Sequence, residues 1–474
     1  MSKQKLQSGV PLVEYEATIG LEIHVQLGTK SKMFCRCDNN SDTAEPNINV
    51  CPICMGYPGT LPVINEQAID WGIKTALVLG CSINSIQKFD RKNYFYPDLP
   101  KGYQISQFFY PVGEKGNLAV DYLGSDRKTK HEFTVGITRL HLEEDAGKLI
   151  HASDATLVDF NRCGTPLAEI VTEPDIKSPE EAKAFMQELQ RLVRSLGVSS
   201  ADMEKGHLRV DANVSVKPLG HDTLGAKVEV KNMNSFKFME QALQFEIVRQ
   251  TDMLKRGERI EQETRGWDEK TNSTVSQRSK EGSVDYRYFP EPDLPPIIVS
   301  QEKIDEVQST LPPLPTHLRL RGEEAGLPYE RVVELQDLGK LNDFVQLISD
   351  HSDIDPILLA NWIGKSFADI KELFEFVTVV KLKALSNSGA QKLHGLMQEK
   401  HLPPKDLVEQ IKTLGEDELK LFVLEAIQNN PEVVIKFKTG DTKVLAYLVG
   451  QVIKNSRGEA EPALVKQILT QLLT

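Results

Sequence analysis

Two short segments of this chain, 20–27 and 208–216, alternate apolar and polar side chains with a period of two residues. Successive side chains of a strand point to opposite faces, so this period predicts two β-strands that each bury one face. An ordinary solvated face carries threonine, lysine, serine and glutamine. Here the polar faces carry residue types that bind metals and phosphates, namely Glu22, His24, Arg209, Asp211, Asn213 and Ser215. The pattern therefore predicts a sheet with a metal and phosphate site.

Three further segments place acids on predicted strands. Glu229 alternates with Lys227 and Lys231, the run 143–145 ends a strand that begins near Ile137, and Glu169 lies within an apolar strand. An unpaired buried carboxylate is costly, so Glu169 needs a cation or must stay protonated. Ordinary ion pairs could satisfy each acid separately. Several converging carboxylates, however, would repel one another unless a divalent ion neutralised them.

Four of the six cysteines form two close pairs, Cys35 with Cys37 and Cys51 with Cys54. Two such pairs supply the four thiolates of a closed structural zinc site, although the first pair has one intervening residue where two are usual. A disulfide framework is not expected in a cytosolic chain. Cys81 and Cys163 are isolated and are expected to be small buried hydrophobes.

Composition indicates a soluble globular protein of 474 residues, 40% of them hydrophobic, without a signal peptide or membrane span. We expect a cytoplasmic chain with no membrane association. A formal charge of −12 argues against a protein that coats nucleic acid, but it allows recognition of one folded RNA through a local basic patch. Residues 431–474 carry basic residues that could form such a patch, although a solvated helical face is the simpler interpretation. These residues are Lys436, Lys438, Lys443, Lys454, Arg457 and Lys466.

The segment 88–107 interleaves four cations with five aromatic rings, and prolines and a glycine punctuate it. Lys88, Arg91, Lys92 and Lys101 could hold phosphates while a ring stacks on a nucleobase. Alternatively, the rings fill the core and the lysines lie between them. The chain has no P-loop and no dinucleotide-binding glycine motif, so a nucleotide would need a sheet-based site.

The order of these patterns predicts an α+β architecture with three parts. The first part, 1–298, is a largely antiparallel-sheet domain with helices expected at 178–197 and 235–257. From residue 301 amphipathic helical patterns replace strands, and prolines at 403 and 404 separate a helical domain, 299–404, from a helical tail, 405–474.

Several long motifs, in order along essentially the whole chain, resemble the GatB family, the B subunits of aspartyl/glutamyl-tRNA amidotransferases. The block 159–175 is close to a family signature, apart from a small alanine at position 168. The other matching segments are 19–24, 89–107, 137–148, 208–213, 231–235 and 285–294.

The resemblance implies a catalytic cradle domain, a helical domain and a YqeY-like tail that binds tRNA through its basic patch. It also implies a ligase that forms carbon–nitrogen bonds with glutamine as amido donor. ATP would phosphorylate the side-chain carboxylate of misacylated Glu-tRNA(Gln), Asp-tRNA(Asn) or both. Ammonia from the amidase, or A, subunit would then displace the phosphate, within a heterotrimer completed by the small C subunit.

The same resemblance assigns an Mg²⁺-dependent catalytic site to five residues: Glu22, His24, Glu144, Glu169 and Glu229. From charge and strand position we expect substrate or phosphate contacts from Lys88, Arg91, Lys92, Arg209, Asp211 and Lys231. The resemblance makes the zinc pair a scaffold, because some family members lack these cysteines.

Two alternatives belong to other classes. A noncatalytic scaffold would only position tRNA for another subunit, but an RNA-binding surface would avoid the acidic strands. An ATP-dependent ligase could instead act on a small free amino acid. Activity on free glutamate without tRNA would favour that second alternative.

Overall fold

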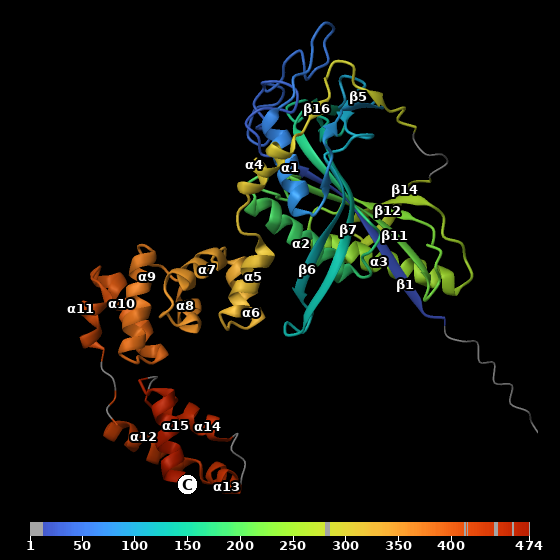
Figure 1. Ribbon diagram of the computed structural model, residues 1–474. Helices are drawn as coiled ribbons and strands as arrows, with labels where there is room; N and C mark the ends of the chain where they lie inside the picture. The colour runs from blue at the N-terminus through green and yellow to red at the C-terminus, as the bar shows by residue number, and fades with distance from the viewer. Residues whose placement is uncertain are drawn as a thin grey trace, which may run out of the picture. The chain divides into compact units, whose positions relative to one another are not determined.

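The computed structural model describes residues 13–279, 285–411, 414, 416–439, 444–456 and 459–473. The chain forms two compact units, one ending at His317 and one beginning at Leu318. Figure 1 shows strands only in the first unit, coloured blue to yellow, and helices in the second, coloured yellow-orange to red. Over these described ranges, no helix is long and apolar enough to cross a membrane.

A nine-stranded sheet forms the frame of the first unit. Its neighbours are antiparallel, except for the parallel pair of β12 and β13. In order across the sheet the strands are β14 (Ser273–Ser279), β13 (Glu263–Asp268), β12 (Val228–Lys231), β11 (Leu208–Pro218), β1 (Tyr15–Gln26), β10 (Pro166–Thr172), β7 (Lys130–Glu144), β6 (Gly113–Leu123) and β2 (Ser82–Ile83). The predicted largely antiparallel α+β domain is confirmed.

The strand β1 lies at the centre of the sheet, and its period of two separates an apolar from a polar face. Leu21, Ile23 and Val25 are fully buried in the main hydrophobic core. Glu22 and His24 alternate with them and therefore point to the opposite face. This division places the acids on one side of the sheet and the core on the other.

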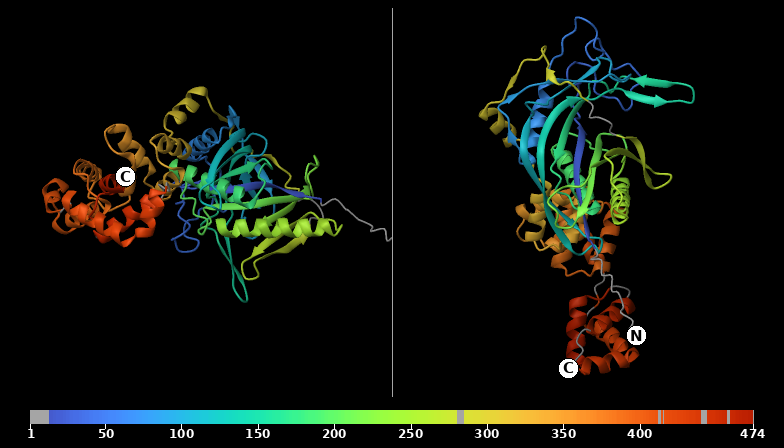
Figure 2. Two further views of the ribbon diagram at one scale, coloured as in Figure 1. Left: turned by 90° about the horizontal axis from the view of Figure 1, so that it is seen from below. Right: turned by 90° about the vertical axis from the view of Figure 1, so that its right-hand side faces the viewer.

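Four helices of the first unit contribute described residues to its core: α1 (Glu66–Val78), α2 (Pro179–Ser195), α3 (Phe236–Lys255) and α4 (Gln301–Ser309) (Figure 2). Ser178 and Ser235 cap α2 and α3 by accepting hydrogen bonds from the third residue beyond them, which confirms both predicted helices. The sequence patterns did not identify α1. Its Gly72 packs against Leu142 of β7, where an added Cβ would lie 3.0 Å from a leucine methyl.

Shorter strands tie distant segments to the sheet. Residues 90–93, 103–106 and 289–290 form one small sheet, which brings the aromatic and basic segment beside the 285–294 motif. The bounds are β15 (Phe289–Pro290), β4 (Asp90–Asn93) and β5 (Tyr103–Ser106) in that sheet, β16 (Ile297–Ile298) with β3 (Ile86–Gln87) in a second, and β8 (Lys148–His151) with β9 (Thr156–Asp159) in a hairpin.

Beyond β16, the described chain is helical. The helices are α4 (Gln301–Ser309), α5 (Pro315–Glu324), α6 (Tyr329–Asp337), α7 (Leu341–Asp350), α8 (Pro356–Trp362), α9 (Ile370–Leu382), α10 (Asn387–Lys400), α11 (Pro404–Leu407), α12 (Glu416–Asn429), α13 (Pro431–Lys438), α14 (Leu445–Asn455) and α15 (Pro462–Leu473), with a 3₁₀ turn at Val408–Gln410.

The packing of these helices bears on the expected domain limits. Val307 of α4 belongs to the core of the first unit, so that unit continues past the expected limit at 298. The helical residues form two further cores, one from Leu327 to Ile411 and one from Leu419 to Leu473. The expected limit at 404 lies at the start of α11, whose Leu407 still belongs to the earlier of these two cores.

Candidate active site

The polar face of the sheet brings acids and histidines from neighbouring strands into rows. His24 of β1 lies opposite Glu169 of β10 on one side and Arg209 of β11 on the other. Glu169 in turn lies opposite His141 of β7. Directly opposed residues of antiparallel strands have closely spaced Cβ atoms, so these four side chains lie side by side.

Two histidines and two glutamates form the centre of this face. His24 Nε2 lies 3.4 Å from Glu143 Oε1 and 3.4 Å from Glu169 Oε2. His141 Nε2 lies 3.2 Å from Glu169 Oε2 and 3.8 Å from Glu143 Oε2. Three of these side chains are almost fully buried, so water does little to screen the interactions among them.

The ligand atoms of this cluster are close enough to share one ion. Those of Glu22, His24 and Glu169 lie within 4.8 Å of one another, and so do those of His141, Glu143 and Glu169. Glu169 belongs to both groups. Two overlapping sets of carboxylate and imidazole donors are an arrangement that can hold a divalent cation.

Mutual contacts perturb the protonation equilibria of the cluster. Burial alone would lower the pKa of His24, but hydrogen bonds to Glu143 and Glu169 outweigh burial and raise that pKa to about 10. Burial would also raise the pKa of both glutamates. For Glu143 the charge of Lys92 and the two histidines reverse this, and for Glu169 the histidines do so, so that each pKa lies well below its ordinary value.

Glu22 has the opposite shift. Burial, followed by repulsion from Glu169, raises the pKa of Glu22, while His24 partly offsets both effects. Repulsion from Asp211, which lies opposite Glu22 on β11, adds to the increase. A divalent ion bound near Glu22 would remove this repulsion.

A second row of charges continues from Glu22 towards β12. Lys231 Nζ forms a short hydrogen bond with Asp211 and lies 3.3 Å from Glu229 Oε1. Thr264 donates a 2.7 Å hydrogen bond to the other oxygen of Glu229. Glu229 therefore lies on the same face, in contact with a lysine and a threonine, and it belongs to neither group of close ligand atoms.

The acidic run at the end of β7 separates into three environments. Glu143 faces the histidines, whereas Lys101 Nζ donates to both carboxylate oxygens of Glu144, at 2.6 and 2.7 Å. Asp145 accepts a 2.7 Å hydrogen bond from Arg209. Adjacent strand residues point to opposite faces, which explains why Glu143 and Glu144 do not share a site. In this structure Glu143, and not the expected Glu144, is therefore the acid of the run that lies beside His24 and His141.

Besides Lys101, the aromatic and basic segment 88–107 carries three cations, and these have different partners. Lys92 Nζ lies 3.9 Å from Glu143 Oε2 and 5.3 Å from the centre of the Tyr286 ring. Arg91 instead binds Glu291 through hydrogen bonds of 2.7 and 2.8 Å, and Lys88 Nζ lies 4.5 Å from the centre of the Tyr110 ring. Only Lys92 of these three contacts the acidic cluster.

Aromatic rings lie close to Lys92. The Phe108 ring stacks on that of Tyr288 at 4.2 Å between ring centres, with 17° between their planes. Arg139 lies 5.2 Å from the centre of the Phe108 ring. The ring of Tyr288 also contacts that of Tyr286, at 6.0 Å between centres. A planar group could stack at the edge of these rings. Phosphate contacts, in contrast, would come from the neighbouring lysine and arginine side chains.

The four paired cysteines come together as predicted. The sulfur atoms of Cys35, Cys37, Cys51 and Cys54 all lie within 4.8 Å of one another, an arrangement that suits a tetrahedral zinc ion. The hydrogen bond from Cys35 lowers the pKa of the Cys54 thiol to about 5. The isolated Cys81 and Cys163 are buried, as expected.

The sequence analysis did not single out His141, it placed Lys101 only among the cations expected to hold phosphates, and it left Glu143 unresolved within the acidic run. A signal was present for two of them, since His141 and Glu143 are two residues apart on one strand and so share a face. No periodicity points to Lys101, because it lies in a turn and meets Glu144 only through the fold.

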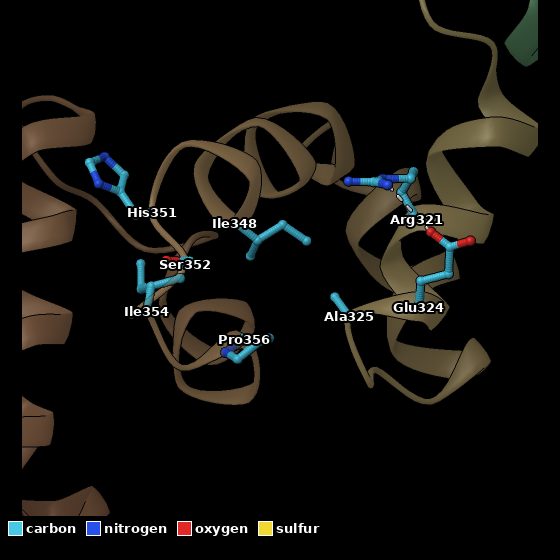
Figure 3. A pocket seen from close by; sticks show the side chains of 8 residues that line it. All are labelled: Arg321, Glu324, Ala325, Ile348, His351, Ser352, Ile354 and Pro356. Carbon is cyan, nitrogen blue, oxygen red and sulfur yellow. Dashed lines mark ion pairs between the residues drawn. The ribbon is translucent and has the colours of Figure 1, made fainter.

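The helical unit holds a different kind of cavity. A pocket of this unit has a volume of about 300 Å³, and two of the residues that line it, Arg321 and Glu324, form an ion pair at 3.5 Å. Figure 3 shows these side chains with the others that line the pocket. None of the predicted site residues lines it. Of the basic tail residues, Lys436, Lys438, Lys454 and Lys466 are exposed, and Lys443 and Arg457 lie outside the described residues.

Comparisons with known proteins match the sheet-containing part and the helical part of the chain to two separate family models. A model described as the GatB/GatE catalytic domain matches residues 17–305, and a model described as the GatB domain matches 359–473. The chain is 45% identical to the B subunit of the aspartyl/glutamyl-tRNA(Asn/Gln) amidotransferase of Rippkaea orientalis, over 97% of this chain and 98% of the relative. It is 44% identical to that of Thermotoga maritima and 42% identical to that of Brevibacillus brevis, in each case over 97% of this chain and 99% of the relative.

Proposed function

Because this chain belongs to the GatB family of aspartyl/glutamyl-tRNA(Asn/Gln) amidotransferase B subunits, we propose that it carries the ATP-dependent half of tRNA amidation. As part of an amidotransferase it belongs to the ligases that form carbon–nitrogen bonds with glutamine as amido donor. Its substrates are misacylated Glu-tRNA(Gln), Asp-tRNA(Asn) or both. The side-chain carboxylate is phosphorylated by ATP, and ammonia then displaces phosphate to leave the amide.

One observation carries the proposal: His24, His141, Glu143 and Glu169 converge from three adjacent strands of one sheet face. The donors fit a divalent ion, because Glu22, His24 and Glu169 offer oxygen and nitrogen atoms within 4.8 Å of one another. When bound there, Mg²⁺ would lower the repulsion between the phosphates of ATP and the attacking carboxylate. We replace Glu144 by Glu143 in the proposed ligand set and keep Glu229 as a nearby acid.

The remaining side chains of this face would bind and orient the substrates. Lys92 and Lys231 each hold a positive charge beside the acids, where a phosphoryl oxygen could take the place of a carboxylate. Arg209 is held by Asp145 and lies opposite His24, so its guanidinium is fixed in direction. Fixed cations at a developing negative charge stabilise a transition state without reorganising.

We further propose one structural zinc ion on the four paired cysteines. All four positions of a tetrahedral ion would be filled by sulfur, so this ion would order the loop and would not react with substrate. The structure of the loop supports this role, because backbone hydrogen bonds from Met55 to Cys51 and from Gly56 to Ile53 close a turn around the second cysteine pair.

The proposed partners are the amidase (A) subunit, the small C subunit and misacylated tRNA, and the proposed location is the cytoplasm. Exposed apolar side chains support association with protein partners. Phe95 is 80% exposed and Tyr96 is 58% exposed, and both line a pocket that Lys101 also lines. Exposed aromatic residues are enriched in protein interfaces. The exposed lysines of α13, α14 and α15 would contact tRNA phosphates.

The test separates chemistry from binding. Glu169→Ala and Glu229→Ala variants of this chain, incorporated into the complex, should bind tRNA and assemble normally but lose amide formation even when ammonium replaces glutamine. Glu258→Ala, which removes an exposed acid paired with Arg256, is the control and should behave as wild type. Full activity of the two site variants with ammonium would favour the scaffold alternative. Assays with each misacylated tRNA would define the substrate.

A further inference from the structure

Lys32 is a buried lysine beside the cysteine cluster. Its side chain is 0% exposed, and its Nζ donates a 2.7 Å hydrogen bond to the carbonyl oxygen of Asn49. The same nitrogen lies 3.5 Å from the carbonyl oxygen of Phe160 and 3.9 Å from Cys54 Sγ. Nζ thus has two backbone carbonyls and one sulfur as its neighbours.

The Lys32 ammonium group has no carboxylate partner among the residues that the structure describes. The nearby Glu144 is bound by Lys101 at 2.6 Å. A buried ammonium ion is costly unless a negative charge compensates it, and a neutral carbonyl supplies only part of that compensation. The neighbouring Cys54 sulfur would supply negative charge if it were deprotonated by a bound metal ion.

A tetrathiolate zinc centre has the charge that is needed. Four thiolates and one Zn²⁺ carry a net charge of −2, because metal-bound thiols are deprotonated. Such a dianion in a partly buried loop is itself costly without a nearby cation. The hydrogen bond from Lys32 to Cys54 therefore compensates both charges at once.

We infer that Lys32 is a positioning residue for the zinc site, whose ammonium group stabilises the tetrathiolate centre by a charged hydrogen bond to Cys54. The inference rests on the proposed zinc ion. Substitution of a residue that hydrogen-bonds to a metal ligand typically lowers metal affinity 10–100-fold.

The same contact joins the zinc loop to the acidic end of β7. A Cβ added at Gly164 would lie 3.4 Å from Lys32 and 3.5 Å from Cys54, so these side chains pack on the turn at 161–165. The backbone nitrogen of Gly164 donates to the carbonyl oxygen of Asp145. Lys32 therefore lies where the metal loop meets the segment that carries the catalytic acids.

The experiment measures zinc binding by full-length protein in competition with a chromophoric chelator, for wild type, Lys32→Met and Lys32→Gln. Lys32→Gln retains an amide donor for the carbonyls but removes the charge. Lys74→Met is the control, because Lys74 also donates to a backbone carbonyl, that of Leu196, which lies outside the cysteine loop. We expect zinc affinity to fall about 10–100-fold in both Lys32 variants and to stay unchanged in Lys74→Met.

A spectroscopic measurement separates charge from simple packing. With Co²⁺ in place of zinc, removal of the ammonium group should move the thiolate-to-cobalt charge-transfer band to longer wavelength, because a hydrogen bond stabilises the sulfur electrons. Wild-type affinity and an unshifted band in Lys32→Gln would overturn the inference and leave the zinc site intact. If the wild-type protein binds no zinc, the zinc proposal is overturned as well. If both variants are insoluble, a crystal structure of zinc-loaded wild type decides, and a Lys32 Nζ turned away from Cys54 refutes the inference.

Discussion

His24 of β1 lies directly opposite Glu169 of β10, with 3.4 Å between the imidazole Nε2 and a carboxylate oxygen. The two residues lie on neighbouring strands of the sheet that are far apart in sequence. Because Glu169 also contacts His141, it has a histidine on each side. The buried carboxylate expected to need a cation thus has two imidazoles beside it, and it remains a member of both groups of potential metal ligands.

The first prediction tests whether Glu143, and not Glu144, belongs to the proposed ligand set. Glu143→Gln keeps the size of the side chain but removes the charge that contacts His24, His141 and Lys92. We expect ammonium-dependent amide formation by the assembled complex to fall about 100-fold or more, a loss typical of a preorganised electrostatic group. The measurement is a single-turnover assay on misacylated tRNA. Activity near wild type in Glu143→Gln, together with loss in Glu144→Gln, would restore the original assignment.

The second prediction concerns the ion pair between Lys101 and Glu144, whose side chains are 6% and 2% exposed. Glu144→Gln leaves a buried ammonium ion without its partner, so we expect the free energy of unfolding of the first unit to fall by about 3–5 kcal/mol. The double variant Lys101→Met with Glu144→Leu should recover much of this loss, because neither charge remains. Urea denaturation followed by tryptophan fluorescence measures both. Equal destabilisation of the single and double variants would contradict the prediction.

The third prediction concerns how pH changes the stability of the protein when divalent metal is kept away. It follows from the shifted pKa values of His24 and Glu169. The folded pKa of His24 is raised to about 10 from an ordinary 6.5, so its stabilising contribution is fully present below pH 6.5 and is lost as pH rises through 10. The pKa of Glu169 is lowered, so its contribution is present above its ordinary value of 4.5 and is lost at more acidic pH.

The measurement is the melting temperature in EDTA from pH 5 to pH 10, for wild type and His24→Gln. The stability difference between the two proteins should be largest near pH 5–6.5 and should shrink steadily towards pH 10. A difference that grows with pH would show that His24 is neutral in the folded protein. His221→Gln, which changes an exposed histidine, serves as the control.

Much of this site could be predicted from strand periodicity alone. The period of two in 20–27 and 208–216 correctly placed Glu22, His24, Arg209 and Asp211 on one face, because a buried opposite face fixes the register. The same rule separates Glu143 from Glu144, because Leu140 and Leu142 are buried in the core and therefore place His141 and Glu143 together on the polar face. This signal lay in the residues before the acidic run, whereas the three acids themselves carry no such pattern.

Other features depend on contacts between distant segments. Arg91 was expected to bind phosphate, yet Glu291, 200 residues later, holds its guanidinium through two hydrogen bonds. Sequence spacing contains no information on such a pair. The helix α1 was missed because Gly72 interrupts its apolar pattern, and the need for that glycine appears only where Leu142 packs against it.

The last prediction concerns removal of the proposed zinc ion. Cys51→Ser removes one of the four thiolates, and we expect the zinc content of purified protein to fall from one ion per chain to nearly none. The loop should then become open to proteolysis between residues 38 and 60, since the ion would no longer hold its two cysteine pairs together. Zinc content is measured by atomic emission, and cleavage sites by mass spectrometry. Cys81→Ser changes a buried thiol outside the cluster and should retain the metal, which excludes a general effect of losing a cysteine. A Cys51→Ser protein that keeps a full equivalent of zinc and an uncut loop would place the ion elsewhere.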